Sequence, residues 1–340
     1  MSSPGDLPRV SVTMPVFNGE AYVTEAVNSV LAQTFRDFEL VAVNDGSTDS
    51  TPDILASLAS QDKRIRVFHH QTNKGIVAAR NKALQMARGE FVAVLDADDV
   101  CLPRRLAAQV AFLEGHPEVG VLGTGVQGID GEGVVSPGKW IPPGEHGVLL
   151  WRLCFDNPYP HSSVMMRRSL VERVGGYRPG TEPSEDYDLF RQLGEVTRLS
   201  SLQEVLLLRR WHGKSASKTR SSEQMRNADR IRALMVSQFL GEGAVPCEWN
   251  WQSRSAFEAR NRAKMIQKLL REFVRRVNLD KDETTTVRRD AATRMYEYCR
   301  SWSSYPAIWP AMFGAFCLEP KLLPRVTRSR FLKGPANPRQ

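Results

Sequence analysis

Three aspartates, Asp96, Asp98 and Asp99, stand within four residues, directly after an apolar run at 91–95 that indicates a strand. Their negative charges repel one another, so the cluster needs a cation or a set of hydrogen-bond donors. Alternation along the chain aims Asp96 and Asp98 the same way, which suits binding of a hard divalent ion such as Mg2+ or Mn2+. Because such ions complete their shell with substrate phosphates, the motif indicates a nucleotide diphosphate. A solvated acidic turn is the alternative for this motif taken alone.

Other polar motifs also follow segments with strand character. Residues 9–16, 38–43, 65–69 and 91–95 are apolar and β-branched, and helical patterns lie between them, as at 76–87. This repetition of strand and helix predicts a parallel sheet covered by helices. Ligands of such sheets bind at the carboxyl ends of the strands, which is where the polar motifs fall.

The first two strands end in turn residues that also suit a nucleotide base. Pro15, Phe17 and Asn18 form either a simple strand-to-helix turn or a surface that places backbone and Asn18 against a base. Asp45 stands too early to cap the helix expected from about Thr51. Its carboxylate can accept a hydrogen bond from the N3–H group of uracil, and a purely structural turn is the alternative.

The third strand is followed by Gly75 and, further along, Arg80. Gly75 lets the backbone approach a ligand closely. Arg80 lies about one and a half turns into the following helix, where it can pair with Asp45 or Asp96 or reach the nucleotide.

Two later segments carry further candidates for chemistry. Glu185 and Asp186 begin a helix, where acids are favoured by the dipole, but adjacent side chains cannot both serve one cap. One of these carboxylates can therefore act as a general base. His212, in a basic loop, can bind a metal or a phosphate oxygen, although a structural role is equally open for a single histidine. Arg210 or Lys214 can neutralise a diphosphate leaving group.

Taken together, these motifs resemble those of family 2 glycosyltransferases of the bacterial type in their order and spacing. The resemblance rests on Pro15-Val16-Phe17-Asn18, Asn44-Asp45-Gly46-Ser47-Thr48-Asp49, Asn73-Lys74-Gly75 with Arg80-Asn81, Asp96-Ala97-Asp98-Asp99 and Glu185-Asp186-Tyr187-Asp188. It implies an α/β, Rossmann-like GT-A fold with a mostly parallel central sheet flanked by helices. A catalytic domain over 1–215 would comprise a nucleotide-sugar half at about 8–127 and an acceptor half at about 128–215. The resemblance covers about residues 8–215; beyond it, the pattern of the sequence itself predicts a helical, basic region at 216–340.

The resemblance also implies roles for individual residues. Asp186 matches the general base, Asp45 the acid that recognises the nucleotide base, and Asp96 the residue near the ribose. Asp98 matches the metal ligand, and His212 stands where many relatives place a histidine near the diphosphate. The implied donor-binding residues are Pro15, Phe17, Asn18, Asp45, Gly75, Arg80, Asp96, Ala97, Glu185 and His212, and the implied metal ligands are Asp98 and His212.

The activity implied is an inverting transfer of a sugar from a nucleotide diphosphate, with UDP expected, to a hydroxyl of a saccharide or lipid-linked acceptor. Mn2+ or Mg2+ would be the cofactor, and cell-surface polysaccharide or glycan synthesis the pathway. The alternative is a sensor or scaffold that binds nucleotide sugars without turnover. The presence of both Asp98 and Asp186 argues against that alternative.

Composition sets broad limits on the class of protein. The 340 residues are 41% hydrophobic and 25% charged, which is ordinary for a globular protein. Five scattered cysteines without a C-x-x-C pair disfavour a disulfide framework or a zinc site and suit a reducing compartment. The first residues lack the pattern of a signal peptide, and no apolar stretch is long enough to span a membrane. We therefore expect a cytoplasmic protein.

Charge is distributed unevenly along the chain. Residues 1–208 contain 19 Lys and Arg against 26 Asp and Glu, whereas residues 209–340 contain 27 against 12. The basic part suits peripheral contact with the inner face of a membrane, with Trp302, Trp309 and Phe313 at the interface. A solvated helical surface is the commoner explanation of such charge. A nucleic-acid partner is not expected, because the basic segment lacks regularly interleaved aromatic residues.

Overall fold

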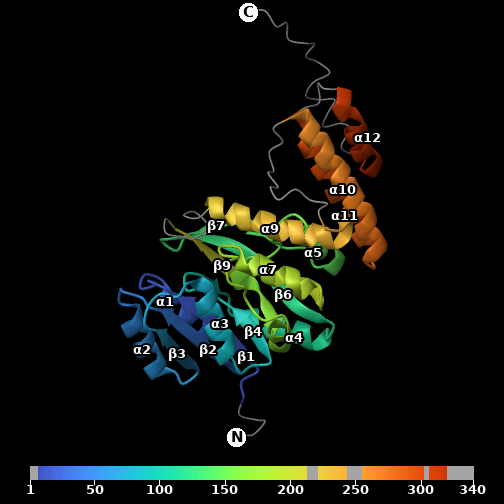
Figure 1. Cartoon of the computed structure of the whole chain (residues 1–340). Helices are drawn as coiled ribbons and strands as arrows, with labels where there is room; N and C mark the ends of the chain where they lie inside the picture. Colours follow the sequence, from blue (N-terminus) through green and yellow to red (C-terminus); the bar gives the residue numbers. More distant parts are fainter. Residues whose placement is uncertain (1–6, 213–220, 243–254, 302–305, 320–340) are drawn as a thin grey trace, which may run out of the picture. The chain divides into compact units, whose positions relative to one another are not determined.

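The computed structural model of the chain describes residues 7–212, 221–242, 255–301 and 306–319 (Figure 1). The chain divides into two compact units, residues 1–231 and 232–340. The domain boundary expected at residue 215 lies outside the described residues.

The first unit contains a sheet whose parallel part is formed by the strands nearest the N-terminus. The order in the sheet is β3-β2-β1-β4-β8-β6-β9-β5, and β7 pairs with β6 off this path. β1 is parallel to β2 and β4, and β2 is parallel to β3. The strands are β1 (Val10–Val16), β2 (Phe38–Asp45), β3 (Ile65–His70), β4 (Phe91–Val94), β5 (Val100–Cys101), β6 (Val119–Asp130), β7 (Val135–Trp140), β8 (Met165–Arg167) and β9 (Arg198–Trp211).

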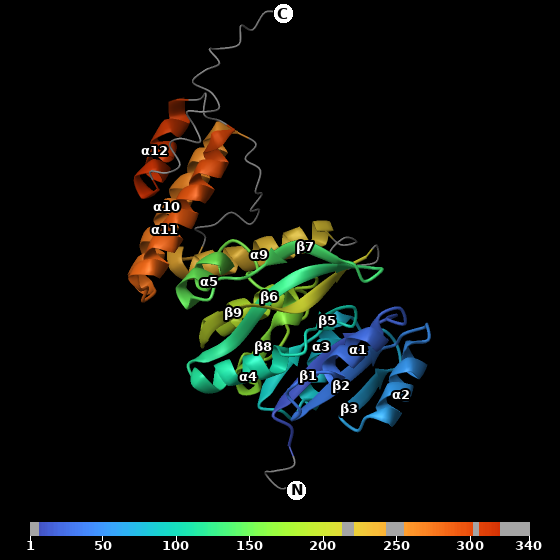
Figure 2. The ribbon, with the colours of Figure 1, turned by 180° about the vertical axis from the view of Figure 1, so that it is seen from behind.

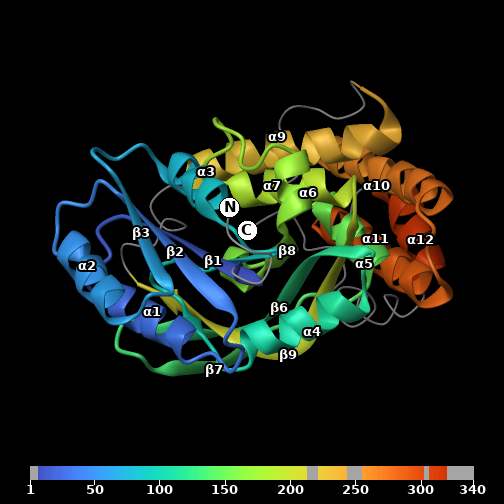
Figure 3. The same cartoon turned by 90° about the horizontal axis from the view of Figure 1, so that it is seen from below.

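Helices cover both faces of this sheet, as the alternation of buried residues along β2 shows. Leu40 and Ala42 pack into the core on the side of α1, α2 and α4, whereas Val41 and Val43 pack against α3 on the other side (Figure 3). The helices of this unit are α1 (Val23–Leu31), α2 (Thr51–Gln61), α3 (Ile76–Met86), α4 (Arg105–Gly115), α5 (His146–Leu153), the short η1 (His161–Ser163), α6 (Arg168–Arg173) and α7 (Glu185–Gly194), with α9 (Ser221–Leu240) crossing into the second unit.

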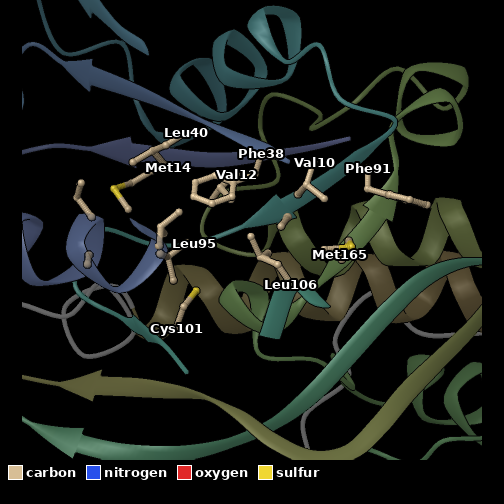
Figure 4. Close-up of a cluster of buried hydrophobic side chains, with 14 of the residues drawn as sticks. Val10, Val12, Met14, Phe38, Leu40, Phe91, Leu95, Cys101, Leu106 and Met165 are labelled. Carbon is tan, nitrogen blue, oxygen red and sulfur yellow. The ribbon is translucent and has the colours of Figure 1, made fainter. Parts of the chain in front are cut away.

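The larger core lies beneath the parallel strands. Val12 and Met14 of β1 gather with Leu40 of β2, Leu95 after β4 and Leu106 of α4, all fully buried (Figure 4). On β1 the alternate residues Val10, Val12 and Met14 face this core, so a slip by one residue would bring the polar Ser11 and Thr13 into it. The predicted α/β fold with helices flanking the sheet is confirmed.

Beyond the parallel strands, the sheet becomes mixed. β8 is antiparallel to both β4 and β6, and the long β9 runs parallel to β6 (Figure 2). The end of β6 pairs with β7 in an antiparallel hairpin. Because β8 is antiparallel to both β4 and β6, and β9 is parallel to β6, β9 runs in the same direction as β4. His212, which directly follows β9, therefore lies at the same edge of the sheet as the ends of the first strands.

The second unit is helical, as the sequence predicts for this part. Its helices are α10 (Ala256–Arg276), α11 (Lys281–Arg300), the short η2 (Pro306–Ile308) and α12 (Trp309–Leu318). α10 buries Ala259, Ala263, Ile266, Leu270 and Phe273, whose spacing places them on one face of the helix. The start of α11 is fixed by a capping box between Asp280 and Glu283.

A pH-dependent contribution to stability arises where α5 meets β9. The Nδ1 atom of His146 accepts the backbone N–H of Leu199 at 3.0 Å. Burial, aided by the charge of Arg198, lowers the pKa of His146 to about 4 from the 6.5 of the unfolded chain. The unfolded chain therefore binds the extra proton between these two values, and the stability present above pH 6.5 is lost as the pH falls towards 4.

Replacing His146 by Asn keeps an acceptor for the N–H of Leu199 but removes the titrating ring. We expect the wild type to lose up to about 3 kcal/mol more than H146N between pH 7 and pH 4. Urea denaturation of both proteins at pH 7 and pH 4.5 measures most of this difference. An equal loss in the two proteins would contradict the role of His146.

Candidate active site

The loops after β1 and β2 are joined by hydrogen bonds from Asn18. Its Oδ1 accepts the backbone N–H of Thr48 at 2.9 Å, and its own N–H donates to Ser47 Oγ at 2.9 Å. Asn18 has a φ of 50°, a left-handed conformation that Asn tolerates better than most residues. Pro15 is buried in register with Val43, so these contacts place the exposed ring of Phe17 at the carboxyl edge of the sheet.

Asp45, at the end of β2, holds the loop that follows β3. Its Oδ1 accepts the backbone N–H of Lys74 at 3.0 Å and the Nδ1–H of His70 at 2.6 Å, and its Oδ2 accepts the backbone N–H of Gly75 at 2.9 Å. The neighbouring Gly46 has a φ of +68°, and a Cβ there would lie 2.5 Å from the backbone N of Asn73. Only glycine therefore allows the two loops to meet backbone to backbone.

Arg80 links the two halves of the site. Its Nη2 donates to Asp96 Oδ1 at 3.0 Å, and its Nη1 contacts Glu185 Oε1. The guanidinium lies 5.6 Å from the ring centre of Tyr177. Burial alone would lower the pKa of Arg80, but the charges of Glu185 and Asp96 raise it, so the side chain remains charged. The sequence allows both Asp45 and Asp96 as partners of Arg80. In the structure Arg80 pairs with Asp96 and not with Asp45.

The three aspartates after β4 have different partners. Asp96 faces Arg80, while Asp98 Oδ2 lies 2.9 Å from His212 Nε2. Asp99 is buried and accepts the backbone N–H of Arg210 at 2.8 Å. The strand alternation from which a shared orientation of Asp96 and Asp98 was expected is not present, because the chain forms a turn here.

The carboxyl groups of Asp96, Asp98 and Asp99 lie close enough together to shift one another's pKa. Burial, reinforced by the charge of Asp96, raises the pKa of Asp98. Burial, reinforced by Asp98 and then Asp96, raises the pKa of Asp99 to about 8. Burial also acts to raise the pKa of Asp96, but the guanidinium of Arg80 outweighs it and holds that pKa below its usual range. A cation beside Asp98 would relieve this crowding.

The donor set of Asp98 and His212 fits a divalent cation. A carboxylate oxygen and an imidazole nitrogen are ligands that Mn2+ accepts, with diphosphate oxygens completing the shell. Within the residues that the structure describes, no group of three His, Cys, Asp or Glu side chains converges as a metal site. A metal in this site would therefore depend on the substrate for most of its ligands.

Arg210 does not fill the role considered for it from the sequence. Its side chain is 1% exposed and donates to Glu25 Oε2 at 2.6 Å, to the carbonyl of Asp130 at 2.7 Å and to the carbonyl of Asp98 at 2.9 Å. Each nitrogen of this guanidinium already donates to a protein acceptor, so the side chain is held inside the fold rather than presented to a diphosphate. Lys214, the other candidate, lies outside the described residues.

Glu185 and Asp186 point in different directions, as adjacent residues at a helix start must. Glu185 is buried against Arg80. Asp186 Oδ2 accepts the side-chain N–H of Asn157 at 2.8 Å, and Oδ1 accepts the backbone N–H of Tyr187 at 2.7 Å. Asp186 is thus an oriented, partly exposed carboxylate beside the Arg80 link.

Several residues of the site were not identified from the sequence. Asn157 orients Asp186, Ser162 Oγ accepts the backbone N–H of Asp96 at 3.1 Å, and His161 Nε2 lies 2.8 Å from the hydroxyl of Tyr177. His161 and Ser162 belong to η1, which directly precedes β8. Their one signal in the sequence is a polar triplet before an apolar run, which many surface turns share.

The fold and the matches to known proteins define a glycosyltransferase of the GT-A fold. Residues 11–175 match the family described as Glycosyl transferase family 2. EpsE of Bacillus subtilis, named as a glycosyltransferase, is 38% identical over 205 residues, which are 58% of this chain and 72% of EpsE. The glycosyltransferase MJ1057 of Methanocaldococcus jannaschii is 31% identical over 59% of this chain and 70% of its own length. The chain therefore belongs to glycosyl transferase family 2.

Solved structures share its fold. Residues 1–349 of S. aureus TarS in complex with UDP-GlcNAc superpose with a TM-score of 0.57 at 19% identity, over 96% of this chain and 93% of that one. The mannosyltransferase PcManGT of Pyrobaculum calidifontis, in complex with GDP-Man and Mn2+, gives a TM-score of 0.51 at 18% identity, over 93% and 88%.

We expect the Arg80 link to be essential to the stability of the first unit. Replacing Arg80 by Met leaves Glu185 and Asp96 facing each other without their cation, which costs about 3–5 kcal/mol for buried pairs of this kind. Lys82, on the same helix, serves as the control, because K82M removes a partly exposed charge that has only weak contacts with Gln85 and the ring of Phe68, and it should change stability by less than about 1 kcal/mol. Urea denaturation compares the two variants, and equal stabilities would contradict the assignment.

Proposed function

We propose that the chain is an inverting glycosyltransferase that moves a sugar from a UDP-sugar to a hydroxyl of a saccharide or lipid-linked acceptor, in the synthesis of cell-surface polysaccharide or glycan. The observation that carries the proposal is the contact of one guanidinium, that of Arg80, with both Asp96 and Glu185. Asp96 and Glu185 are both expected to bind the donor. Their shared contact with Arg80 places them beside Asp186, the carboxylate expected to act as the general base.

The donor would lie along the carboxyl edge of the parallel strands. The nucleotide base would meet Asp45 and the exposed ring of Phe17, and the backbone at Gly75 and Ala97 would approach the nucleotide. Asp96 would bind near the ribose. Two features support UDP: Asp45 is a carboxylate that can accept the N3–H of uracil, and TarS, which shares the fold, binds UDP-GlcNAc.

Asp98 and His212 would hold a divalent cation against the diphosphate. When bound, such an ion stabilises the negative charge that develops on the leaving diphosphate. PcManGT, a neighbour in fold, binds Mn2+ with its donor. The crowded carboxylates at 96–99 support the same assignment for this chain.

The proposed transfer needs no nucleophile from the enzyme. The acceptor oxygen forms a bond to the anomeric carbon while the bond from that carbon to the diphosphate oxygen breaks, and UDP departs with the bonding electrons. Asp186 takes the proton of the acceptor hydroxyl. Asn157 donates to Oδ2 of Asp186 and the backbone N–H of Tyr187 donates to Oδ1, which fixes the carboxylate as it receives that proton. Attack from the face opposite the leaving group inverts the anomeric centre.

A nucleotide-sugar sensor without turnover is the second candidate. The contacts that orient Asp186 argue against it, because a sensor binds the donor without needing a general base. Incubation of the protein with Mn2+ and a set of UDP-hexoses, followed by measurement of released UDP, separates the two functions. Donor binding without release, with acceptors present, would favour the sensor.

We expect Asp186→Asn to abolish transfer while leaving donor affinity nearly unchanged. The substitution keeps the shape of the side chain and an acceptor oxygen but removes the base, which contributes about 10²–10⁴-fold to the rate. Calorimetry with UDP-hexoses and Mn2+ measures the affinity, and a product assay measures the rate. Full turnover by D186N would overturn the assignment of the base.

The matched variant on the donor side is Asp98→Ala, which should show the opposite behaviour. Removing Asp98 should weaken donor binding in Mn2+ and abolish the difference between titrations with Mn2+ and with EDTA. The comparison of the two variants thus separates proton removal from metal-dependent binding. If the effect of Mn2+ were the same in D98A and in the wild type, the metal site would have to lie elsewhere.

We also propose peripheral contact of the second unit with an anionic membrane. On α12, Trp309 and Phe313 are 62% and 69% exposed and lie one helical turn apart. The basic excess of residues 209–340 complements anionic lipid. Trp302 lies outside the described residues, and no described helix is both long and apolar enough to cross a bilayer.

Flotation with liposomes containing anionic lipid tests this contact. Replacing both Trp309 and Phe313 by Ser should reduce the bound fraction severalfold, because two exposed apolar side chains no longer enter the interface. Phe257→Ser is the control, since it removes a 73% exposed Phe from α10 of the same unit. Equal binding of the wild type and the W309S/F313S variant would dispose of the proposal.

A further inference from the structure

Two histidines at the end of β3 form polar pairs with the end of β2. The parallel register places His69 opposite Asn44 and His70 opposite Asp45. The amide nitrogen of Asn44 lies 3.1 Å from His69 Nδ1, and His70 Nδ1 lies 2.6 Å from Asp45 Oδ1. Of these two pairs, only the one between His70 and Asp45 includes a residue proposed to bind the donor.

The acceptor positions of Asp45 are nearly all occupied. A carboxylate offers about four lone-pair positions to hydrogen-bond donors. On Oδ1 two are taken, by His70 and the N–H of Lys74, and on Oδ2 one is taken by the N–H of Gly75. Among the residues that the structure describes, these three donors leave one position, on Oδ2. Two of the three donors are backbone groups of one loop, and His70 supplies the third from the neighbouring strand.

We propose that His70 is a positioning residue that fixes Asp45 so that its last lone pair receives the N3–H of a uracil or thymine ring. The inference rests on the proposed function, since it deepens the base recognition assigned to Asp45. The backbone N–H groups of Lys74 and Gly75 hold one position on each oxygen, and His70 fills the second position on Oδ1 from a different strand, which fixes the plane of the carboxylate and leaves Oδ2 to the ligand. The site then selects nucleoside diphosphates whose base carries a hydrogen on N3.

Cytosine is the base against which this arrangement discriminates. Its N3 carries no hydrogen and is itself an acceptor, so it would face the fixed lone pair of Asp45 with no proton between them. A buried acceptor that loses its donor is costly, and this is how a polar site rejects a close analogue. Without His70, Asp45 would be held by two N–H groups of one loop alone, and a carboxylate that shifts with that loop would lower both the penalty for cytosine and the gain for uracil.

A merely structural role for His70 makes a different prediction. His70 also helps to hold the loop at 73–75 against β2, and loosening that loop would weaken every nucleotide alike. The ratio of the affinities for UDP and CDP separates the two roles, because it responds to the lone pair of Asp45 and not to the loop as a whole.

The experiment is isothermal titration of the full chain with UDP, dTDP and CDP in Mn2+, for the wild type, H70A, H70N and H69A. Hydrogen bonds to a charged group correspond to about tenfold to a hundredfold in affinity. We expect H70A to bind UDP and dTDP about tenfold more weakly than the wild type, with a much smaller change for CDP. H70N should restore most of the ratio, because the amide nitrogen of Asn is attached to Cγ as Nδ1 is in His.

His69 provides the matched control, since it lies beside His70 and pairs with the same strand but with an amide. H69A should leave the ratio of UDP to CDP affinity as in the wild type. A melting curve for each variant shows whether it is folded at the temperature of titration. If a folded H70A kept the wild-type ratio, or if UDP and CDP bound equally to the wild type, His70 would have no role in selection.

The same titrations distinguish this failure from that of the proposed function. A wild-type chain that bound none of the three nucleotides would refute the donor site as a whole, and the selection by His70 with it. A wild-type chain that bound UDP well, combined with an H70A variant of unchanged ratio, would leave the glycosyltransferase assignment intact and overturn only the inference about His70.

Discussion

The pairing of one buried arginine with two carboxylates is the constraint on which the arrangement of the site depends. Arg80, on α3, contacts Asp96 after β4 and Glu185 at the start of α7. A buried guanidinium without carboxylates, or buried carboxylates without a guanidinium, would carry an uncompensated charge. α3, the turn after β4 and the start of α7 must therefore keep the positions in which these three side chains are in contact. Asp186 takes its place from this geometry, since it is the next residue to Glu185.

The parallel part of the fold follows from the sequence because its signals are local. The β-branched runs of β1 to β4 and the helical patterns between them require a sheet covered on both faces, and Leu40, Val41, Ala42 and Val43 alternate between two cores as that requires. Motifs at the carboxyl ends of adjacent parallel strands must converge at one edge. The positions of Asn18, Asp45 and Gly75 were predictable for this reason.

The contacts of the site were less predictable, because they join residues that are distant in the sequence. Asp98 meets His212 across 114 residues, and the backbone N–H of Arg210 reaches Asp99 across 111. No local pattern fixes such pairs; they depend on the parallel pairing of β9 with β6. The same limit explains why Arg210 was expected at the diphosphate and why Asn157, His161 and Ser162 were not identified. Their roles depend on how η1 and β8 return to the edge of β4.

The parallel pairing of β6 with β9 also sets the order in which the site can be completed on the ribosome. A nascent chain that has emerged as far as α4 already contains β1 to β4 and the aspartates that follow them, but it lacks the partners of Asp98 and Asp99. The backbone N–H of Arg210 and the ring of His212 arrive only with β9 and the residue after it, about a hundred residues later. Until then Arg80 of α3 can already pair with Asp96, whereas Asp98 has neither His212 nor any other donor from the end of β9 and is left to water and its ions.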